Sequence, residues 1–325
     1  MIQYLYLGRL DYAEALRLQE ELVALRTQGR IGNTLLLLEH PPVLTLGRNA
    51  NRANILASND LLARRGVTLH EINRGGDVTY HGPGQLIGYP IFDLRSLRNP
   101  TSGPAGGGGR LGPVDFVRLM EEALIRLCAE FGVQAGRICG LTGVWCGLQT
   151  ATADRSPKSE QALLCSKSLP PAGRERKLAA IGIHVSRGVT SHGFAFNVTT
   201  DLGDFSLINP CGITDRAVTT LEREVADPKS LPNLESIAHK AARQFGFVFG
   251  QQVLALENLA TLRAQAESAQ SGAAADSGPE PDAYHSPEPD FPAEDAPLAV
   301  PLEVERLRRS KPRPVSAWRV ATRQN

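Results

Sequence analysis

The sequence has little that would place the chain in a disulfide scaffold, a metal site or a membrane. Its 325 residues contain five cysteines, an odd number, and no C-x-x-C pair occurs. We therefore expect neither a disulfide framework nor a structural zinc site, and a reducing cytoplasm is the predicted location. No run of about 18 apolar residues is present, so no membrane span is expected.

A strong charge of either sign is also missing. The formal net charge is +1, which gives no global field that would favour nucleic acid or an anionic membrane. With 42% hydrophobic and 21% charged residues, the composition is that of a globular protein with a sizeable core. The first thirty residues lack an apolar signal core, and their pattern predicts a short strand and an amphipathic helix rather than an export signal.

Short apolar runs and one strongly periodic segment indicate mixed secondary structure. Runs at Thr34–Leu38 and Val43–Leu46 flank a Pro-Pro pair and predict strands. Asp115–Phe131 has apolar residues at helical spacing, with Asp115 as the expected N-cap and Cys128 on the buried face. Further strands are expected at 177–185 and 193–198, and a further helix at 233–245.

Three stretches predict no regular structure. Residues 99–113 are rich in glycine and proline, but neither a G-x-x-x-x-G-K-[ST] motif nor a preceding strand supports a phosphate loop, so we expect a flexible insertion. Residues 148–176 predict a second flexible insertion. In the C-terminal extension 250–325, the apolar content after about Gln265 is too low for a core, and disorder is expected. Its acidic and then basic composition fits either a partner contact or a solvated extension.

The densest group of polar and glycine residues is NRGGDVTYHGPGQ at Asn73–Gln85. Glycines permit positive φ and close backbone approach, while the polar side chains can make directed contacts with a ligand. The alternative is a tight hairpin. In a second segment, Lys177–Val198, small residues occur where a strand normally has branched ones, which indicates that something approaches the backbone closely. Lys177 itself is either a solvated strand end or a catalytic residue.

Cys211 lies between Pro210 and Gly212, which predicts a turn. A turn thiol near a cation can act as a nucleophile, because the thiolate is the reactive form. An incidental cysteine is the alternative. The other cysteines, Cys139, Cys146 and Cys165, have no comparable setting and are interpreted as structural or incidental.

Several of these segments together resemble the signature blocks of one family. They are RGGDVTYHGPGQ at Arg74–Gln85, KLAAIGIHVSR at Lys177–Arg187, SHGFAFNV at Ser191–Val198 and NPCGI at Asn209–Ile213. EHPPVLTLGR at Glu39–Arg48 is similar to a further block, with Leu44 where tyrosine is more usual. In this order the blocks resemble the lipoyl(octanoyl) transferase family, over residues 1–249, which we interpret as the catalytic domain.

The resemblance implies an α+β fold in which helices flank a mixed central β-sheet, as in the catalytic domain of biotin and lipoate protein ligases. It also implies an acyltransferase without a metal or other cofactor. The octanoyl group of octanoyl-acyl carrier protein would pass to Cys211 and then to the lysine ε-amine of a lipoyl domain. The implied acceptors are the lipoyl domains of 2-oxoacid dehydrogenases and the glycine-cleavage H protein.

The resemblance assigns roles to particular residues. Cys211 would carry the acyl group and Lys177 would activate it. Substrate contacts are implied for three short stretches: Arg74, Gly75, Gly76, Asp77, Val78, Thr79, Tyr80 and His81; Ala180, Ile181 and Gly182; and Gly193, Phe194 and Ala195. An ammonium within about 4–6 Å can lower a thiol pKa of about 8.5 by roughly 1–3 units. The oxyanion donors remain open between the Gly75-Gly76 turn and the Gly212 turn.

Three other functions remain possible at this point. An ATP-dependent lipoate or biotin ligase of the same fold would not need Cys211. A non-catalytic binding module would keep the cavity without the chemistry, which the presence of both Lys177 and Cys211 argues against. A cysteine hydrolase would use His81 or His192 as its base, a role that the resemblance does not give them.

Overall fold

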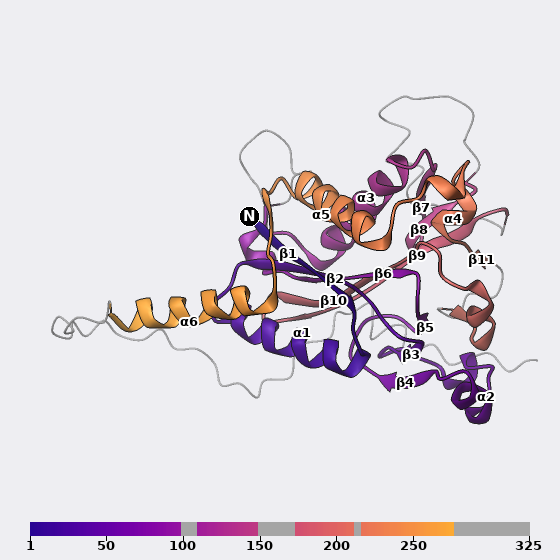
Figure 1. Ribbon diagram of the computed structural model, residues 1–325, viewed down its shortest axis with the longest axis horizontal. Coiled ribbons are helices and arrows are strands. Elements are labelled where there is room, and N and C mark those ends of the chain that lie inside the picture. Colours follow the sequence, from indigo (N-terminus) through magenta and orange to yellow (C-terminus); the bar gives the residue numbers. More distant parts are fainter. Residues whose placement is uncertain (99–108, 149–172, 211–215, 276–325) are drawn as a thin grey trace, which may run out of the picture. The chain divides into compact units, whose positions relative to one another are not determined.

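The computed structural model describes residues 1–98, 109–148, 173–210 and 216–275. Within them, nine strands form one mixed sheet, in the order β12-β1-β2-β6-β10-β9-β8-β7, with β11 paired to β9 (Figure 1). Three further strands form a small sheet in the order β4-β3-β5. The strands are β1 (Ile2–Arg9), β2 (Asn33–Glu39), β3 (Val43–Leu46), β4 (Thr68–Glu71), β5 (Val78–His81), β6 (Gln85–Ile91), β7 (Ala135–Ile138), β8 (Leu141–Cys146), β9 (Arg176–Ser186), β10 (Val189–Asn197), β11 (Ala217–Val218) and β12 (Val253–Ala255).

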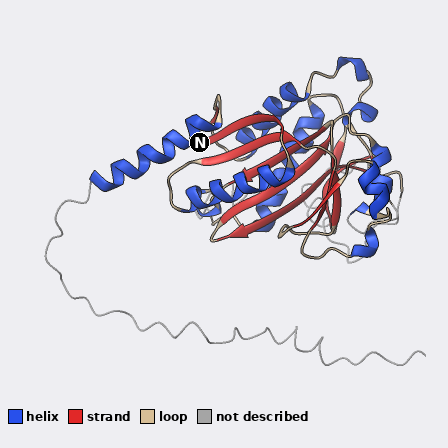
Figure 2. Cartoon of the chain, turned by 60° about the horizontal axis from the view of Figure 1, so that its bottom comes forward, coloured by secondary structure: helices blue, strands red, loops and turns tan. Residues whose placement is uncertain are grey.

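Helices cover both faces of the large sheet. The α-helices of the described residues are α1 (Tyr12–Thr27), α2 (Asn59–Arg64), α3 (Pro113–Ala129), α4 (Leu221–Glu224), α5 (Leu234–Val248) and α6 (Leu259–Ala275). Helices α3 and α5 pack on one face, whereas α1 and the beginning of α6 pack on the other. Figure 2 shows helices in front of and behind the strands. This arrangement confirms the expected α+β fold with a mixed central sheet.

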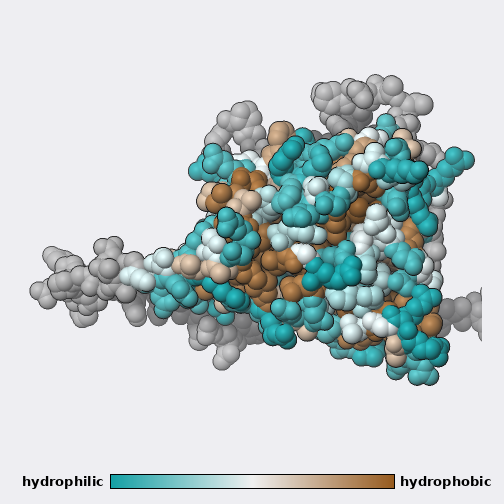
Figure 3. Space-filling view, in the orientation of Figure 1, coloured by the Kyte–Doolittle hydropathy of each residue, from teal (hydrophilic) through white to brown (hydrophobic). Residues whose placement is uncertain are grey.

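Strand β2 explains how one sheet supports two cores. Leu35 and Leu37 belong to the core under α3 and α5, while Leu36 and Leu38 belong to the core over α1. Successive side chains of a strand point to opposite faces, so a strand buried on both faces has a continuous apolar run rather than an alternating one. On the face shown in Figure 3, polar residues cover much of the helices and apolar side chains gather between α5 and α1.

The expected elements are present, with one correction at a helix end. The helix predicted at 115–131 is α3, which begins at Pro113 with Gly112 as N-cap and no side-chain cap. Asp115 is therefore not the N-cap but lies in the first turn, because Pro113 already has the φ that the first helical position requires. Cys128 is buried, as predicted.

The predicted irregular segments lie partly outside the described residues. Flexible insertions were predicted at about 99–113 and 148–176. Of these, residues 99–108 and 149–172 lie outside the described residues. The prediction of disorder after about Gln265 is wrong for the next ten residues, because α6 continues to Ala275. Ala266 is buried, and its carbonyl accepts a 3.1 Å hydrogen bond from Arg30 Nε. The domain boundary near residue 249 stays a prediction.

Candidate functional site

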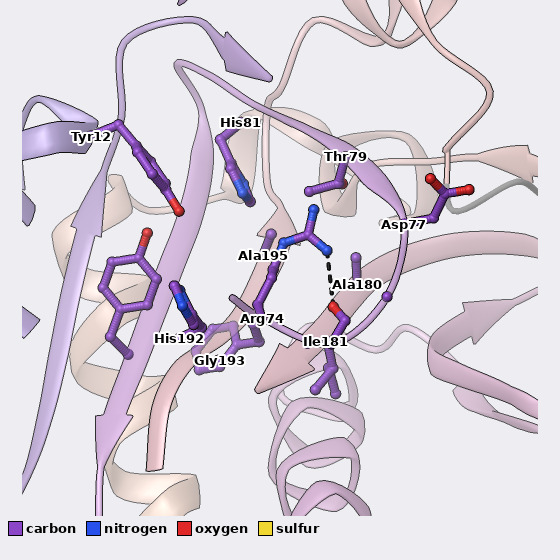
Figure 4. Close-up of a pocket in the computed structure, with 15 residues that line it drawn as sticks. Tyr12, Arg74, Asp77, Thr79, His81, Ala180, Ile181, His192, Gly193 and Ala195 are labelled. Carbon is purple, nitrogen blue, oxygen red and sulfur yellow. Dashed lines mark hydrogen bonds between the residues drawn. The ribbon is translucent and has the colours of Figure 1, made fainter. Parts of the chain in front are cut away.

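A cavity of about 480 Å³, counting its open mouth, lies where the 74–77 loop and β5 meet β9 and β10. It is lined by Tyr12, Arg74, Gly75, Gly76, Asp77, Thr79, His81, Tyr89, Ala180, Ile181, Gly182, His192, Gly193, Phe194 and Ala195 (Figure 4). The structure thus brings together all the residues for which substrate contacts were predicted, except Val78 and Tyr80. Those two pack instead in the core beside the small sheet, because alternate side chains of β5 face opposite ways.

Small residues pair across the strands under this cavity. Ala180 lies opposite Ala195, and Gly182 lies opposite Gly193. A Cβ atom on Gly182 would be 2.8 Å from the carbonyl oxygen of Gly75, and Gly75 N donates to Ile183 O at 3.0 Å. The close approach that the sequence indicated at Gly182 is therefore made by the protein's own 74–76 loop, which rests directly on β9.

Arg74 brings a positive charge to the cavity. Its side chain is buried, and its Nη2 donates to Thr45 O at 2.7 Å and to Thr45 Oγ1 at 2.9 Å. Nη1 donates to Gly75 O at 3.0 Å. Figure 4 shows the guanidinium in the centre of the labelled side chains. The hydrogen bonds to Thr45 hold this cation between the small sheet and β9, so a polar part of a ligand can meet it there.

His81 lines the same cavity as a neutral, hydrogen-bonded imidazole. Gln85 Nε2 donates to Tyr80 O at 3.2 Å and to Asn197 Oδ1 at 2.9 Å. Gln85 Oε1 therefore accepts, at 2.8 Å, the proton on His81 Nδ1. Burial and the neighbouring His40 lower the pKa of His81 to about 3.

His192 is a second buried histidine at this cavity. Its Nε2 lies 2.8 Å from Asn73 Oδ1. Burial and the charge of Arg74 lower the pKa of His192 to about 4. A base this weak abstracts a proton poorly near pH 7, which argues against a hydrolase that relies on His81 or His192.

Lys177 lines an adjoining cavity of about 280 Å³, again counting the space open to solvent. Gln85, Asn197 and Pro210 line this second cavity with it, and the wall of Thr79, Ala180 and Ala195 is shared with the larger cavity. Lys177 is buried at the start of β9, and its carbonyl accepts a 2.9 Å hydrogen bond from Thr219 N. It is therefore not a solvated strand end.

Cys211 itself lies outside the described residues, as does the Gly212 turn. The preceding residue, Pro210, lines the cavity that contains Lys177. Three other cysteines lie in the described residues: Cys139 is partly buried, while burial raises the pKa of Cys146 to about 12 and that of Cys128 well above its usual value. Neither Cys128 nor Cys146 is available as a thiolate near pH 7.

Sequence reasoning missed several residues of the two cavities. Gln85 ends the Arg74–Gln85 segment, but no role was predicted for it. Its hydrogen bonds to His81 and Asn197 show that it lines the Lys177 cavity. Tyr12 begins a helix far from the blocks in sequence, and Tyr89 lies inside an apolar strand. No local signal marks these tyrosines, because tertiary packing alone brings them to the cavity.

Across the described parts of the chain, no group of three or more His, Cys, Asp or Glu side chains could hold a metal ion. Within the same ranges, no helix is both long and apolar enough to cross a membrane.

This chain is similar in sequence to proteins of known family. Residues 11–245 match the family model of the lipoyl protein ligase A/B catalytic domain. An octanoyltransferase of Acidobacterium capsulatum is 58% identical over 79% of this chain and 94% of its own length. One from Koribacter versatilis is 51% identical over 80% of this chain and 88% of its own length.

Solved structures share the fold at low sequence identity. A bipartite lipoate protein ligase of Thermoplasma acidophilum superposes with a TM-score of 0.51 and 14% identity, over 82% of this chain and 90% of that one. That likeness concerns the fold, whereas the sequence matches define the family. The chain therefore belongs to the lipoyl protein ligase A/B catalytic-domain family and, within it, to the lipoyl(octanoyl) transferases.

Proposed function

We propose that this acyltransferase moves an octanoyl group from octanoyl-acyl carrier protein to a lysine of lipoyl domains, through a thioester on Cys211. The observation that carries this proposal is the pair of adjoining cavities. Lys177 and Pro210, the residue before Cys211, line one, and the predicted substrate residues line the other. The curated relatives named octanoyltransferase support the same activity.

In the first step, the Cys211 thiolate attacks the carbonyl carbon of the donor thioester. A new carbon–sulfur bond forms on Cys211, and the bond to the carrier breaks, so that the carrier leaves as a thiol. Lys177 takes the Cys211 proton and returns a proton to the departing sulfur. A positioned acid/base group of this kind contributes about 10²–10⁴-fold to a rate.

In the second step, the acceptor lysine attacks the Cys211 thioester as a neutral amine. A carbon–nitrogen bond forms, the carbon–sulfur bond breaks, and Lys177 accepts the proton that the amine loses. The acceptors proposed are lipoyl domains of 2-oxoacid dehydrogenases and the glycine-cleavage H protein. The reaction uses no cofactor, and we propose that it takes place in the cytoplasm.

The larger cavity suits the acyl chain. The small side chains of Ala180 and Ala195 leave the passage between the two cavities open. Each methylene that becomes buried there contributes about 0.8 kcal/mol. The chain can extend from the Lys177 cavity past the shared Ala180–Ala195 wall into this space, so that the carbonyl stays beside Lys177.

Intact-mass measurement after incubation with octanoyl-acyl carrier protein, without acceptor and without ATP, tests the proposal. The mass should rise by one octanoyl group, and hydroxylamine should remove that group, as it does for a thioester. Cys211→Ala should abolish the adduct. Single substitutions of Cys128, Cys139, Cys146 and Cys165 should retain it.

The main alternative is an ATP-dependent ligase of the same fold, in which an adenylate replaces the enzyme thioester. Transfer that requires ATP, and that Cys211→Ala supports as well as the unmodified protein, would establish the ligase and overturn the transferase. A protein that binds acyl chains but transfers none in either assay would be a binding module.

A further inference from the structure

The end of the larger cavity away from Lys177 is polar. Tyr12, Tyr89 and His192 line this inner end, and none of them lines the Lys177 cavity. The Gly182–Gly193 pair also belongs to it, two residues further along the strands than the shared Ala180–Ala195 wall. At about 3.3 Å per residue, the inner end begins roughly 7 Å beyond that wall.

The two tyrosines of the inner end differ in their hydrogen bonding. Burial lowers the pKa of His40 to about 4, so its ring carries a single N–H proton near pH 7. That proton is on Nδ1, because Nδ1 lies 2.7 Å from Leu10 O, which can only accept. His40 Nε2 consequently accepts a 2.7 Å hydrogen bond from the Tyr89 hydroxyl. The Tyr89 hydroxyl is satisfied by the protein itself.

Tyr12 is only 2% exposed as a residue, but its hydroxyl is not fully shielded from solvent, and it forms no hydrogen bond with any residue that the structure describes. Its ring is fixed among His40, His70 and His81, with centroid separations of 5.0, 5.1 and 6.2 Å. Asp11, the N-cap of α1, holds the start of the helix through a 2.8 Å hydrogen bond from Ala13 N. Figure 4 shows the Tyr12 hydroxyl pointing into the cavity.

We propose that Tyr12 sets the longest apolar acyl chain that the cavity accepts, which rests on the proposed use of this cavity for the acyl chain. Water supplies the partner of a hydroxyl that faces an open cavity, so the Tyr12 hydroxyl is hydrated while the inner end is empty. A methyl end that reaches Tyr12 displaces that water and offers no hydrogen bond in return. The loss amounts to about tenfold or more in affinity, which opposes the gain from burying further methylenes.

Calorimetric titration with free hexanoate, octanoate, decanoate and dodecanoate tests the inference without requiring turnover. For the unmodified protein, affinity should increase up to octanoate and then stop increasing. Tyr12→Phe should tighten decanoate relative to octanoate by about tenfold. Tyr4→Phe is the matched control, because the Tyr4 hydroxyl contacts His239 Nδ1 at 3.0 Å, outside the cavity. The decanoate-to-octanoate affinity ratio of this variant should be unchanged.

A second probe, 10-hydroxydecanoate, separates the hydroxyl's hydrogen bond from its size. It should bind the unmodified protein more tightly than decanoate does, because its hydroxyl can pair with that of Tyr12, and Tyr12→Phe should remove this advantage. Equal decanoate-to-octanoate ratios in both proteins would overturn the inference, as would a failure of all four acids to bind. If no acyl-enzyme forms but the decanoate-to-octanoate affinity ratios are as expected, only the proposed function is overturned.

Discussion

The ammonium of Lys177 lies over the indole ring of Trp145, with Nζ 4.8 Å from the ring centroid. Both side chains are buried, and the two residues are paired between β8 and β9. A cation over an indole face is attracted by the negative face of the ring, more strongly where water is excluded. The contact restricts the long lysine side chain, so that its amine is held at the cavity that Pro210 lines.

Lys177→Ala should keep the fold and reduce octanoyl transfer about 10²–10⁴-fold, the range for loss of a positioned acid/base group. Raising the pH should restore part of the rate, because more Cys211 is then ionised without help. The matched control is Lys240→Ala. Lys240 also lies near an aromatic ring, with Nζ 5.6 Å from the Phe131 centroid, and pairs with Glu130 at 2.8 Å. Steady-state assays measure octanoyl transfer, and circular dichroism checks that the fold is kept.

The rate of alkylation of Cys211 as a function of pH gives the second readout for Lys177. Its midpoint should move upward in Lys177→Ala and stay in place in Lys240→Ala. An identical midpoint in all three proteins would mean that Lys177 does not control ionisation of the thiol, and its role would then be limited to the acceptor amine.

Much of the fold follows from local sequence pattern. The apolar runs that predict strands at 43–46 and 177–185 coincide with β3 and β9 within a residue. The helix expected at 233–245 is α5, with the Asn233 side chain accepting a 2.9 Å hydrogen bond from Ser236 N. These elements are predictable because periodicity and capping depend on neighbours in the sequence.

The parts of the site that could not be predicted depend on contacts between distant segments. The 74–76 loop rests on Gly182, and Tyr12 reaches the cavity because α1 packs under β6 and β10. The small residues of β9 indicate that something approaches closely but not which segment does so, and the Tyr12 contact leaves no periodic or compositional signal. The end of the packed chain was misjudged for the same reason, since the alanine-rich composition after Gln265 does not reveal that Ala266 faces a core formed by α1 and β2.

Ala180→Leu should block the passage between the two cavities. Ala180 belongs to the wall that they share, and its larger replacement would occupy the path of an eight-carbon chain. Octanoyl transfer should fall at least about tenfold, while butanoyl transfer should change much less, with a stability cost of about 1–3 kcal/mol from overpacking. Ala63→Leu on the exposed side of α2 is the control. Parallel losses with both donors would indicate general distortion of the site.

Acid should destabilise the protein through its buried histidines. Burial lowers the pKa of His40 and His192 to about 4 and that of His81 to about 3, so the unfolded chain takes up protons first as the pH falls below about 6.5. Stability is fully present above that pH and is lost as the pH falls toward the folded values. At pH 5.5 the loss should be roughly 1.4 kcal/mol per histidine, or about 4 kcal/mol in all.

Urea unfolding at pH 7.5 and 5.5 measures this loss, and His192→Asn isolates one contribution. His192 has a φ of 55°, a conformation that asparagine tolerates better than most residues. The variant should lose about one third less stability than the unmodified protein between the two pH values. If both lose the same amount, His192 is not among the groups that take up protons.

Helix α6 should stabilise the catalytic unit, whereas residues 276–325 should not. Leu262 is completely buried in the core that contains α1 and β2, and losing such a leucine costs about 2–5 kcal/mol. Ending the chain at Asn258 should therefore lower the melting temperature by roughly 5–15 °C at about 2–4 °C per kcal/mol. Ending it at Ala275 should leave both the melting temperature and octanoyl transfer unchanged, because the composition beyond it has too few apolar residues to form a core.

Point substitutions distinguish loss of the buried contact from loss of chain length. Leu262→Ala should reproduce most of the destabilisation caused by ending the chain at Asn258. Leu254→Ala, at a position that is 43% exposed on β12, is the matched control and should cost little. The surface pair between Arg263 Nη2 and Glu21 Oε2, 2.8 Å apart, contributes little because solvent screens it. A fall of many degrees on ending the chain at Ala275 would contradict this account, since it would require the last fifty residues to pack against the catalytic unit.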